Sequence, residues 1–138
     1  MTWVVFTVRV LLGLSFTFTG ASFFLMPPME PPTQENALKF ITALGASDYM
    51  KVVKVLELLG GLLLLTGRLA PLGLVILVPI TVNIALWDIF LMKFAAPPAG
   101  LILLALEVLV MWGYWPYFAP FFRADATLAG IATSTSRN

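Results

Sequence analysis

The largely apolar stretch from Lys54 to Asn83 constrains the fold of this chain more than any other feature. Two hydrophobic runs meet there at a short turn, Thr66 to Pro71, and one acid, Glu57, lies inside the first run. A stretch of this kind fits poorly on the surface of a water-soluble domain. It predicts a helical hairpin in lipid, and the rest of the chain extends the same pattern.

The composition of the whole chain supports a membrane protein. Of its 138 residues, 60% are hydrophobic and 11% are charged, and the mean hydropathy is +0.98. Soluble domains carry about 25% charged residues, and a soluble core of this length cannot bury so much apolar surface. The net charge of +1 gives no argument for a nucleic-acid partner, so we expect none.

The chain contains no cysteine and no histidine. This excludes, from this chain alone, disulfides, iron–sulfur ligation, ordinary zinc sites and the usual Ser–His or Cys–His nucleophile systems. We therefore expect no catalytic residue, no metal site and no covalently bound cofactor. Any redox chemistry near the protein is expected to belong to a partner or to a bound organic molecule.

Four segments have the length and apolar character of membrane spans, since a hydrocarbon core of ~30 Å needs about 20 residues of helix. They cover residues 3–25, 49–66, 72–92 and 99–122. We predict an all-α membrane protein with a single domain: four transmembrane helices in an antiparallel bundle, followed by a polar tail at 123–138. An even number of spans places both ends of the chain on one side.

The connection between the first two predicted spans holds a shorter helix. Four prolines between Pro27 and Pro32 cannot continue a helix, and Thr33 then offers an N-cap. Apolar residues recur at helical spacing from Ala37 to Leu44, and Gly45 ends the pattern. We predict a short amphipathic helix that lies in the membrane interface or packs across the mouth of the bundle.

Several ionisable side chains fall inside the predicted spans. A rise of ~1.5 Å per residue places Glu57 and Glu107 near mid-depth, with Arg9 within side-chain reach of Glu57. Lys54 and Asp88 share a shallower depth on adjacent helices. An unpaired charge at mid-membrane costs at least ~2.5–3.5 kcal/mol, so we predict an Arg9–Glu57 pair and a structural Lys54–Asp88 ion pair. Glu107 is then the surplus acid, either protonated or paired with another subunit or a ligand.

Two interpretations of these groups stay open. Arg9, Glu57, Asn83 and Glu107 could form a polar pocket that binds a quinone headgroup or a lipid, or that passes a proton. Alternatively, they only lock the register of the helices through hydrogen bonds and ion pairs. We favour the functional interpretation for Arg9 with Glu57, because intramembrane charges usually mark sites, and the structural one for Asn83.

Two stretches of the sequence resemble a known family. They are RVLLGLSFTFTGAS in the first predicted span and KVLELLGGLLLLTGRLAPLGLVILVPITVNIALWDIFL across the second and third. With them the chain resembles the DoxX-like family of small four-helix bacterial inner-membrane proteins. The likeness is strongest at Arg9 and at Glu57–Gly61. A histidine often follows the position of Asn83 in such sequences, and Asp88 occupies that place here.

The resemblance implies a multi-pass protein of the bacterial inner membrane. Some family members are similar to the small subunit of a thiosulfate:quinone oxidoreductase, and others look like membrane partners in redox-stress complexes. It points to Arg9 and Glu57 as the positions that matter most, and to no established catalytic residue.

From these observations we expect a non-catalytic accessory subunit of a larger membrane redox or energy-converting complex. Its expected partners are membrane lipid, other membrane subunits or further copies of itself. A quinone-binding oxidoreductase subunit is the first alternative, and a small proton or solute transporter is the second.

Overall fold

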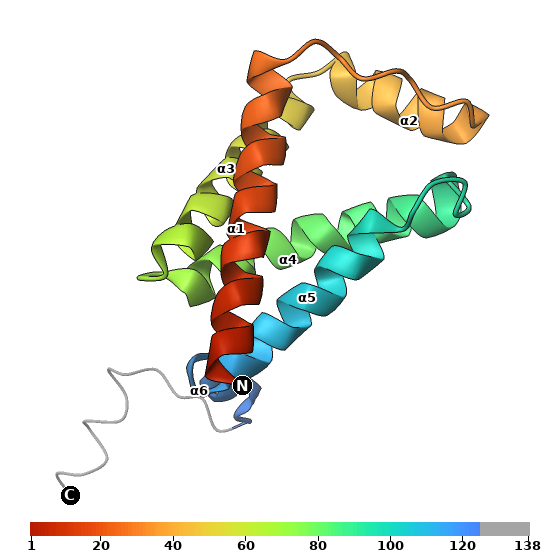
Figure 1. Ribbon diagram of the computed structural model, residues 1–138. Coiled ribbons are helices and arrows are strands. Elements are labelled where there is room, and N and C mark those ends of the chain that lie inside the picture. Colours follow the sequence, from red (N-terminus) through yellow and green to blue (C-terminus); the bar gives the residue numbers. More distant parts are fainter. Residues whose placement is uncertain (125–138) are drawn as a thin grey trace, which may run out of the picture.

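The computed structural model describes residues 1–124, and within this part of the chain it contains helices and no strand (Figure 1). The predicted all-α class is confirmed, whereas the predicted polar tail lies almost entirely outside the described residues. The elements in chain order are α1 (Thr2–Leu25), α2 (Glu35–Gly45), α3 (Tyr49–Thr66), α4 (Ala70–Leu86), the π-helix η1 (Trp87–Leu91), α5 (Ala99–Gly113), α6 (Trp115–Phe118) and the 3-10 helix η2 (Ala119–Phe122).

Two of the described helices are long and apolar enough to cross a membrane: α1, and α4 together with η1. A third candidate is α5 together with the segment formed by α6 and η2, although the chain bends by 86° between α5 and that segment. Helix α3 has 18 residues but carries three charged side chains, Lys51, Lys54 and Glu57. By length and composition, the described chain therefore has two or three membrane-crossing helices.

The four long helices contact one another in a ring (Figure 1). Helix α1 packs against α3, α3 against α4, α4 against α5, and α5 against α1. The buried apolar side chains at the centre come from all of these helices and from α6: Val5, Leu12, Phe16, Leu64, Ala70, Leu74, Leu77, Val110 and Phe118. Figure 1 shows α6 and η2 folded under the end of the bundle where α1 begins.

Glycine allows α1 and α3 to approach closely. A Cβ atom added at Gly61 would lie 2.6 Å from the backbone nitrogen of Thr17, and one at Gly20 would lie 2.9 Å from the backbone nitrogen of Leu58. These neighbours are backbone atoms that cannot move independently, so the interface tolerates no side chain at either position. The contacts also establish that the two helices run antiparallel, with Gly20 beside the first half of α3.

The turn between α3 and α4 forms as the sequence predicts. Helix α3 ends at Thr66 and is capped by Gly67, which has a φ of +73° in the left-handed region that glycine adopts without strain. Helix α4 begins at Ala70 with Pro71 in its first turn, where the missing N–H costs no hydrogen bond. The two helices are thereby antiparallel neighbours.

The predicted continuous helix over residues 99–122 is wrong. Helix α5 ends at Gly113, and the chain bends by 86° into α6 and η2. Pro116 has no N–H to bond the carbonyl of Trp112, and its ring would clash with that carbonyl in a continuous helix. Pro120 restricts the following turn in the same way, so the aromatic end of the chain turns across the bundle.

The amphipathic helix is present as α2, and it packs on α3 and η1. Its buried contact is Ala37, and Phe40 lies against Trp87 of η1 with ring centroids 5.5 Å apart. The N-cap is Gln34, without a side-chain cap bond, so the predicted cap at Thr33 is not used. Figure 1 shows this helix lying across the end of the bundle opposite to α6.

Candidate functional site

Glu57 lies between α1 and α3 and is 2% exposed. Lys54, one turn earlier on α3, donates hydrogen bonds of 3.0 and 2.9 Å from Nζ to the two carboxylate oxygens. The hydroxyl of Thr19 on α1 donates a third bond of 3.1 Å to Oε2. Residues three apart share one face of a helix, so the charge of this acid is neutralised within α3 itself.

The structure forms neither of the two expected ion pairs. Lys54 bonds Glu57 instead of Asp88, and Arg9 reaches the turn at Gly67 rather than Glu57. The physical reason for the separation of Arg9 and Glu57 is the register of α1 on α3. Gly20 lies beside Leu58, so Arg9, earlier on α1, is about 16 Å along the helix axis from the level of Glu57. Because α1 and α3 are antiparallel, the side chains of Arg9 and Glu57 point to opposite ends of the bundle.

Asp88 fastens the π-helix η1 to the start of α5. Its carboxylate Oδ2 accepts a hydrogen bond of 2.7 Å from the backbone N–H of Gly100. The first N–H groups of a helix have no partner within that helix, and a carboxylate is favoured there. Asp88 is 8% exposed, so we interpret it as a buried cap supplied by the preceding helix.

Glu107 lies in the centre of the molecule, fully buried between α4 and α5. The hydroxyl of Thr81 donates a bond of 2.8 Å to its Oε1, and the same hydroxyl lies 3.1 Å from the carbonyl oxygen of Leu77. The other carboxyl oxygen, Oε2, is buried and has no hydrogen-bond partner in the described part of the chain. Among the described residues, no cation lies within ion-pair distance of Glu107, so Glu107 has no cationic partner there, as the sequence predicted.

Asn83 is separated from all of these groups. It is exposed on the outside of α4, whereas Thr81, two residues earlier, is buried. Two residues correspond to about 200° around a helix, so the two side chains lie on opposite faces. The structure therefore places Arg9, Glu57, Asn83 and Glu107 at four separate positions rather than in one pocket.

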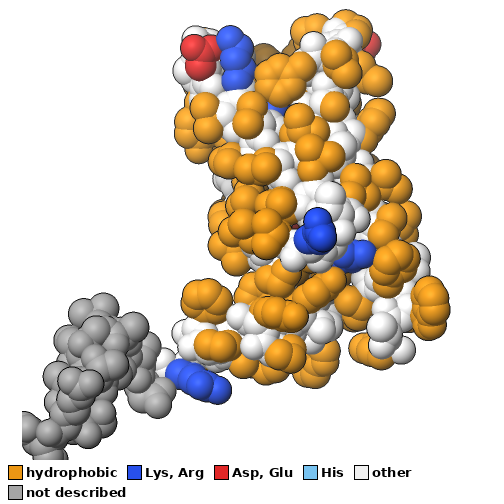
Figure 2. All heavy atoms as spheres, turned by 90° about the vertical axis from the view of Figure 1, so that its left-hand side faces the viewer, with side chains coloured by type: hydrophobic (Ala, Val, Ile, Leu, Met, Phe, Trp, Pro, Cys, Tyr) orange, Lys and Arg blue, Asp and Glu red, His pale blue; other side chains and the backbone are white. Residues whose placement is uncertain are grey.

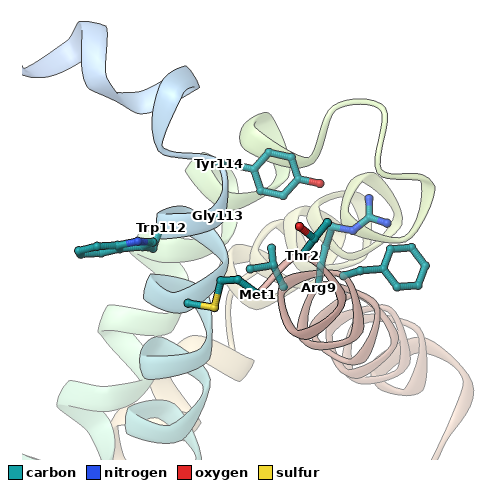
Figure 3. A pocket seen from close by; sticks show the side chains of 8 residues that line it. Met1, Thr2, Arg9, Trp112, Gly113 and Tyr114 are labelled. Carbon is teal, nitrogen blue, oxygen red and sulfur yellow. The ribbon is translucent and has the colours of Figure 1, made fainter.

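Arg9 lines a cavity of ≈ 500 Å³ between the first turns of α1 and the end of α5 (Figure 3). The lining residues are Met1, Thr2, Val5, Phe6, Arg9, Trp112, Gly113 and Tyr114. Arg9 is 8% exposed, and its guanidinium carbon lies 5.1 Å from the centroid of the Phe6 ring. Its Nε is buried and has no hydrogen-bond partner within residues 1–124. Figure 3 shows the hydroxyl groups of Thr2 and Tyr114 turned towards the space that Arg9 faces.

Sequence reasoning identified Arg9 but missed its neighbours in this cavity. The sequence predicted a continuous span over residues 99–122, and the bend after Gly113 that brings Tyr114 back to α1 was not anticipated. The pair of prolines at Pro116 and Pro120 was the available signal. Chemically, the cavity offers one cation and two hydroxyls beside apolar walls, which suits an anion or a hydrogen-bond acceptor.

The described residues contain no group of three or more acidic side chains arranged to hold a metal ion. Comparison of the chain with protein-family models, with curated proteins and with solved structures finds no match. The class that the fold defines is thus a helical protein with two or three helices able to cross a membrane. The DoxX-like resemblance stays a prediction from the two sequence stretches that carry it.

Proposed function

We propose that the chain is an integral membrane protein with four transmembrane helices, α1, α3, α4 with η1, and α5. Helix α3 is antiparallel to α1 and joined by a tight turn to α4, so it shares the depth of two apolar helices. Its charges lie in its first half, where lysine can reach the interface, and Lys54 neutralises Glu57. Helix α5 spans about 22 Å, and the bent segment α6–η2 would lie along the membrane surface.

Site-specific labelling tests this topology, because the chain has no cysteine of its own to give a background signal. Single cysteines would be introduced by Ser47→Cys before α3, Arg68→Cys after α3 and Ala95→Cys before α5. A membrane-impermeant maleimide should modify the first and third from one side of sealed vesicles and the second from the other. Labelling of positions 47 and 68 from the same side would rule out α3 as a span.

Within that topology, we propose that the protein is a non-catalytic accessory subunit of a larger redox or energy-converting complex in the bacterial inner membrane. The observation that supports this proposal is that each of the buried acids is hydrogen-bonded by another residue of the same chain. Glu57 is bonded by Lys54 and Thr19, Asp88 caps α5, and Glu107 bonds Thr81. Groups bonded within the chain stabilise the packing of helices, and the sequence contains no histidine or cysteine for redox chemistry.

The two alternative functions, quinone binding and proton transport, remain predictions from the sequence. A quinone headgroup site built from Arg9, Glu57 and Asn83 would need these side chains to face one space, but they occupy separate places. A proton pathway through Glu57 and Glu107 would need water to reach both, and each is at most 2% exposed. No geometric observation favours either alternative over the accessory role.

The native mass of the protein tests the accessory role directly. Gently solubilised protein from its own membranes would be separated by size, and the chains that co-migrate with it would be identified by mass spectrometry. We expect a large, defined assembly that contains cofactor-bearing chains. Recovery as a monomer or homo-oligomer, under conditions that keep other respiratory complexes intact, would contradict the proposal.

A further inference from the structure

Arg9 is a buried cation whose hydrogen-bonding capacity is unused among the described residues. A guanidinium group carries five N–H donors, yet its Nε has no partner and none of the ion pairs within residues 1–124 involves it. Burying such a charge without a partner is strongly unfavourable. Its favourable contact with the Phe6 ring offsets only part of that cost. A missing anionic partner would explain the position.

Other cations of the described chain lie at the same end of the molecule as Arg9. The turn at Gly67 packs against its guanidinium, and Arg68 follows in the chain. Arg123 lies just beyond η2, at the same end of the molecule. The exposed acids of the described chain, Glu30, Glu35 and Asp48, lie in or beside α2, at the opposite end.

The cavity lining also includes apolar walls. Val5, Phe6, Trp112 and Met1 contribute hydrocarbon and aromatic surface next to the polar groups of Thr2 and Tyr114. In Figure 2 basic side chains at mid-height stand among hydrophobic ones, and the acidic side chains visible on this face lie at its top. An occupant must therefore combine a small negative group with a hydrocarbon chain, as an anionic lipid at the membrane boundary does.

We propose that this cavity binds the phosphate group of an anionic membrane phospholipid. The guanidinium of Arg9 would donate charge-assisted hydrogen bonds to the phosphate oxygens, which its planar fork of donors matches. The hydroxyls of Thr2 and Tyr114 would donate further bonds, and the acyl chains would lie along Phe6 and the adjacent lipid-facing surface. This site does not depend on the accessory role, since an isolated protein and a complex could both hold the lipid.

The test titrates purified protein in an uncharged detergent with dioctanoyl phosphatidylglycerol and follows binding by isothermal titration calorimetry. We expect saturable binding that Arg9→Gln weakens by about tenfold or more, as loss of a charge-assisted bond requires. Tyr114→Phe keeps the ring and should weaken binding by about threefold. Arg123→Gln, which removes an exposed charge at the same end, is the matched control and should leave binding unchanged.

Three results would overturn the proposal. Undiminished binding by both Arg9→Gln and Tyr114→Phe would show that the cavity is not the site. An equal loss in Arg123→Gln would reduce the effect to general attraction between charges. Competition by inorganic phosphate at the lipid's own concentration would assign the cavity to a free anion. Tyr114→Phe keeps the test decisive if Arg9→Gln does not fold, and circular dichroism would establish that each variant is helical.

Discussion

Replacing Lys54 with methionine should destabilise the protein more than any other single change to its charged residues. The substitution removes the cation that bonds both oxygens of Glu57 at 3.0 and 2.9 Å, and it leaves that carboxylate 2% exposed. Among residues 1–124, Thr19 then remains as its one side-chain donor. Breaking a buried ion pair by removing one partner costs about 3–5 kcal/mol, and we expect Lys54→Met to fall in that range.

A double-mutant cycle separates the ion pair from the packing of the two side chains. Glu57→Gln alone should cost about 1–3 kcal/mol, because an amide replaces a charged acceptor and Lys54, 17% exposed, can turn towards the interface. The double variant removes both charges, and replacing a whole buried pair is often close to neutral. The sum of the two losses of unfolding free energy in the single variants should therefore exceed the loss in the double variant by about 2 kcal/mol or more.

The assay is reversible unfolding in mixed micelles, in which a denaturing detergent is titrated and helix content is followed by circular dichroism. Lys51→Met is the control, since Lys51 and Asp48 also form a pair three residues apart but are largely exposed. Exposed pairs contribute little, so the control should show no measurable change. Additive effects across the cycle, or a loss from Lys54→Met no larger than that of the control, would refute the interpretation of a desolvated pair.

Three further predictions concern the packing of α1 on α3, the buried hydrogen bond of Thr81 and the exposed pair of Lys51 and Asp48. Gly61→Val should lower the free energy of unfolding by about 1–3 kcal/mol or more, because its side chain would meet backbone atoms of α1. Gly45→Val, at a site with open space, is the control and should change the free energy of unfolding very little in the same titration. Thr81→Val removes the hydrogen-bond partner of the buried carboxyl on α5 and should cost about 1–3 kcal/mol, whereas Thr81→Ser should retain most of the stability. The hydrogen bond and charge of Lys51 lower the pKa of Asp48 below its ordinary value of 3.8. The stabilisation by this carboxylate is therefore present above pH 3.8 and is lost as the pH falls through the lowered pKa. An NMR titration of the Lys51→Met variant should show the pKa of Asp48 returning towards 3.8.

The sequence predicted the parts of the fold that depend on local patterns. Apolar length predicted α1, α3 and α4, and Gly67 with Pro71 predicted the turn between α3 and α4. The proline run predicted the end of the first helix, and the spacing of apolar residues predicted α2. In each case the signal lies within a few turns of the element that it describes.

The pairing of charges could not be predicted in the same way. Depth along a helix axis was estimated from residue number alone, and that estimate placed Arg9 near Glu57. It did not include the register of α1 on α3, which places Gly20, and not Arg9, beside the level of Glu57. The tilt of each side chain towards its own N-terminus separates Arg9 and Glu57 further and turns Glu57 back towards Lys54. The cavity beside Arg9 depends on the 86° bend after Gly113, a long-range arrangement that helical periodicity does not encode.

The bond between Lys54 and Glu57 joins two residues of one helix, and this has a consequence for biogenesis. A pair that spans two helices can form only after both have entered the bilayer, so the first helix must wait with an exposed charge. In α3 the two charges cancel as soon as the four residues from Lys54 to Glu57 take up helical geometry, before any contact with α1 or α4. The proposed second span can thus leave the translocation machinery already neutralised, and Gly61 can then dock on α1 as a separate, later step.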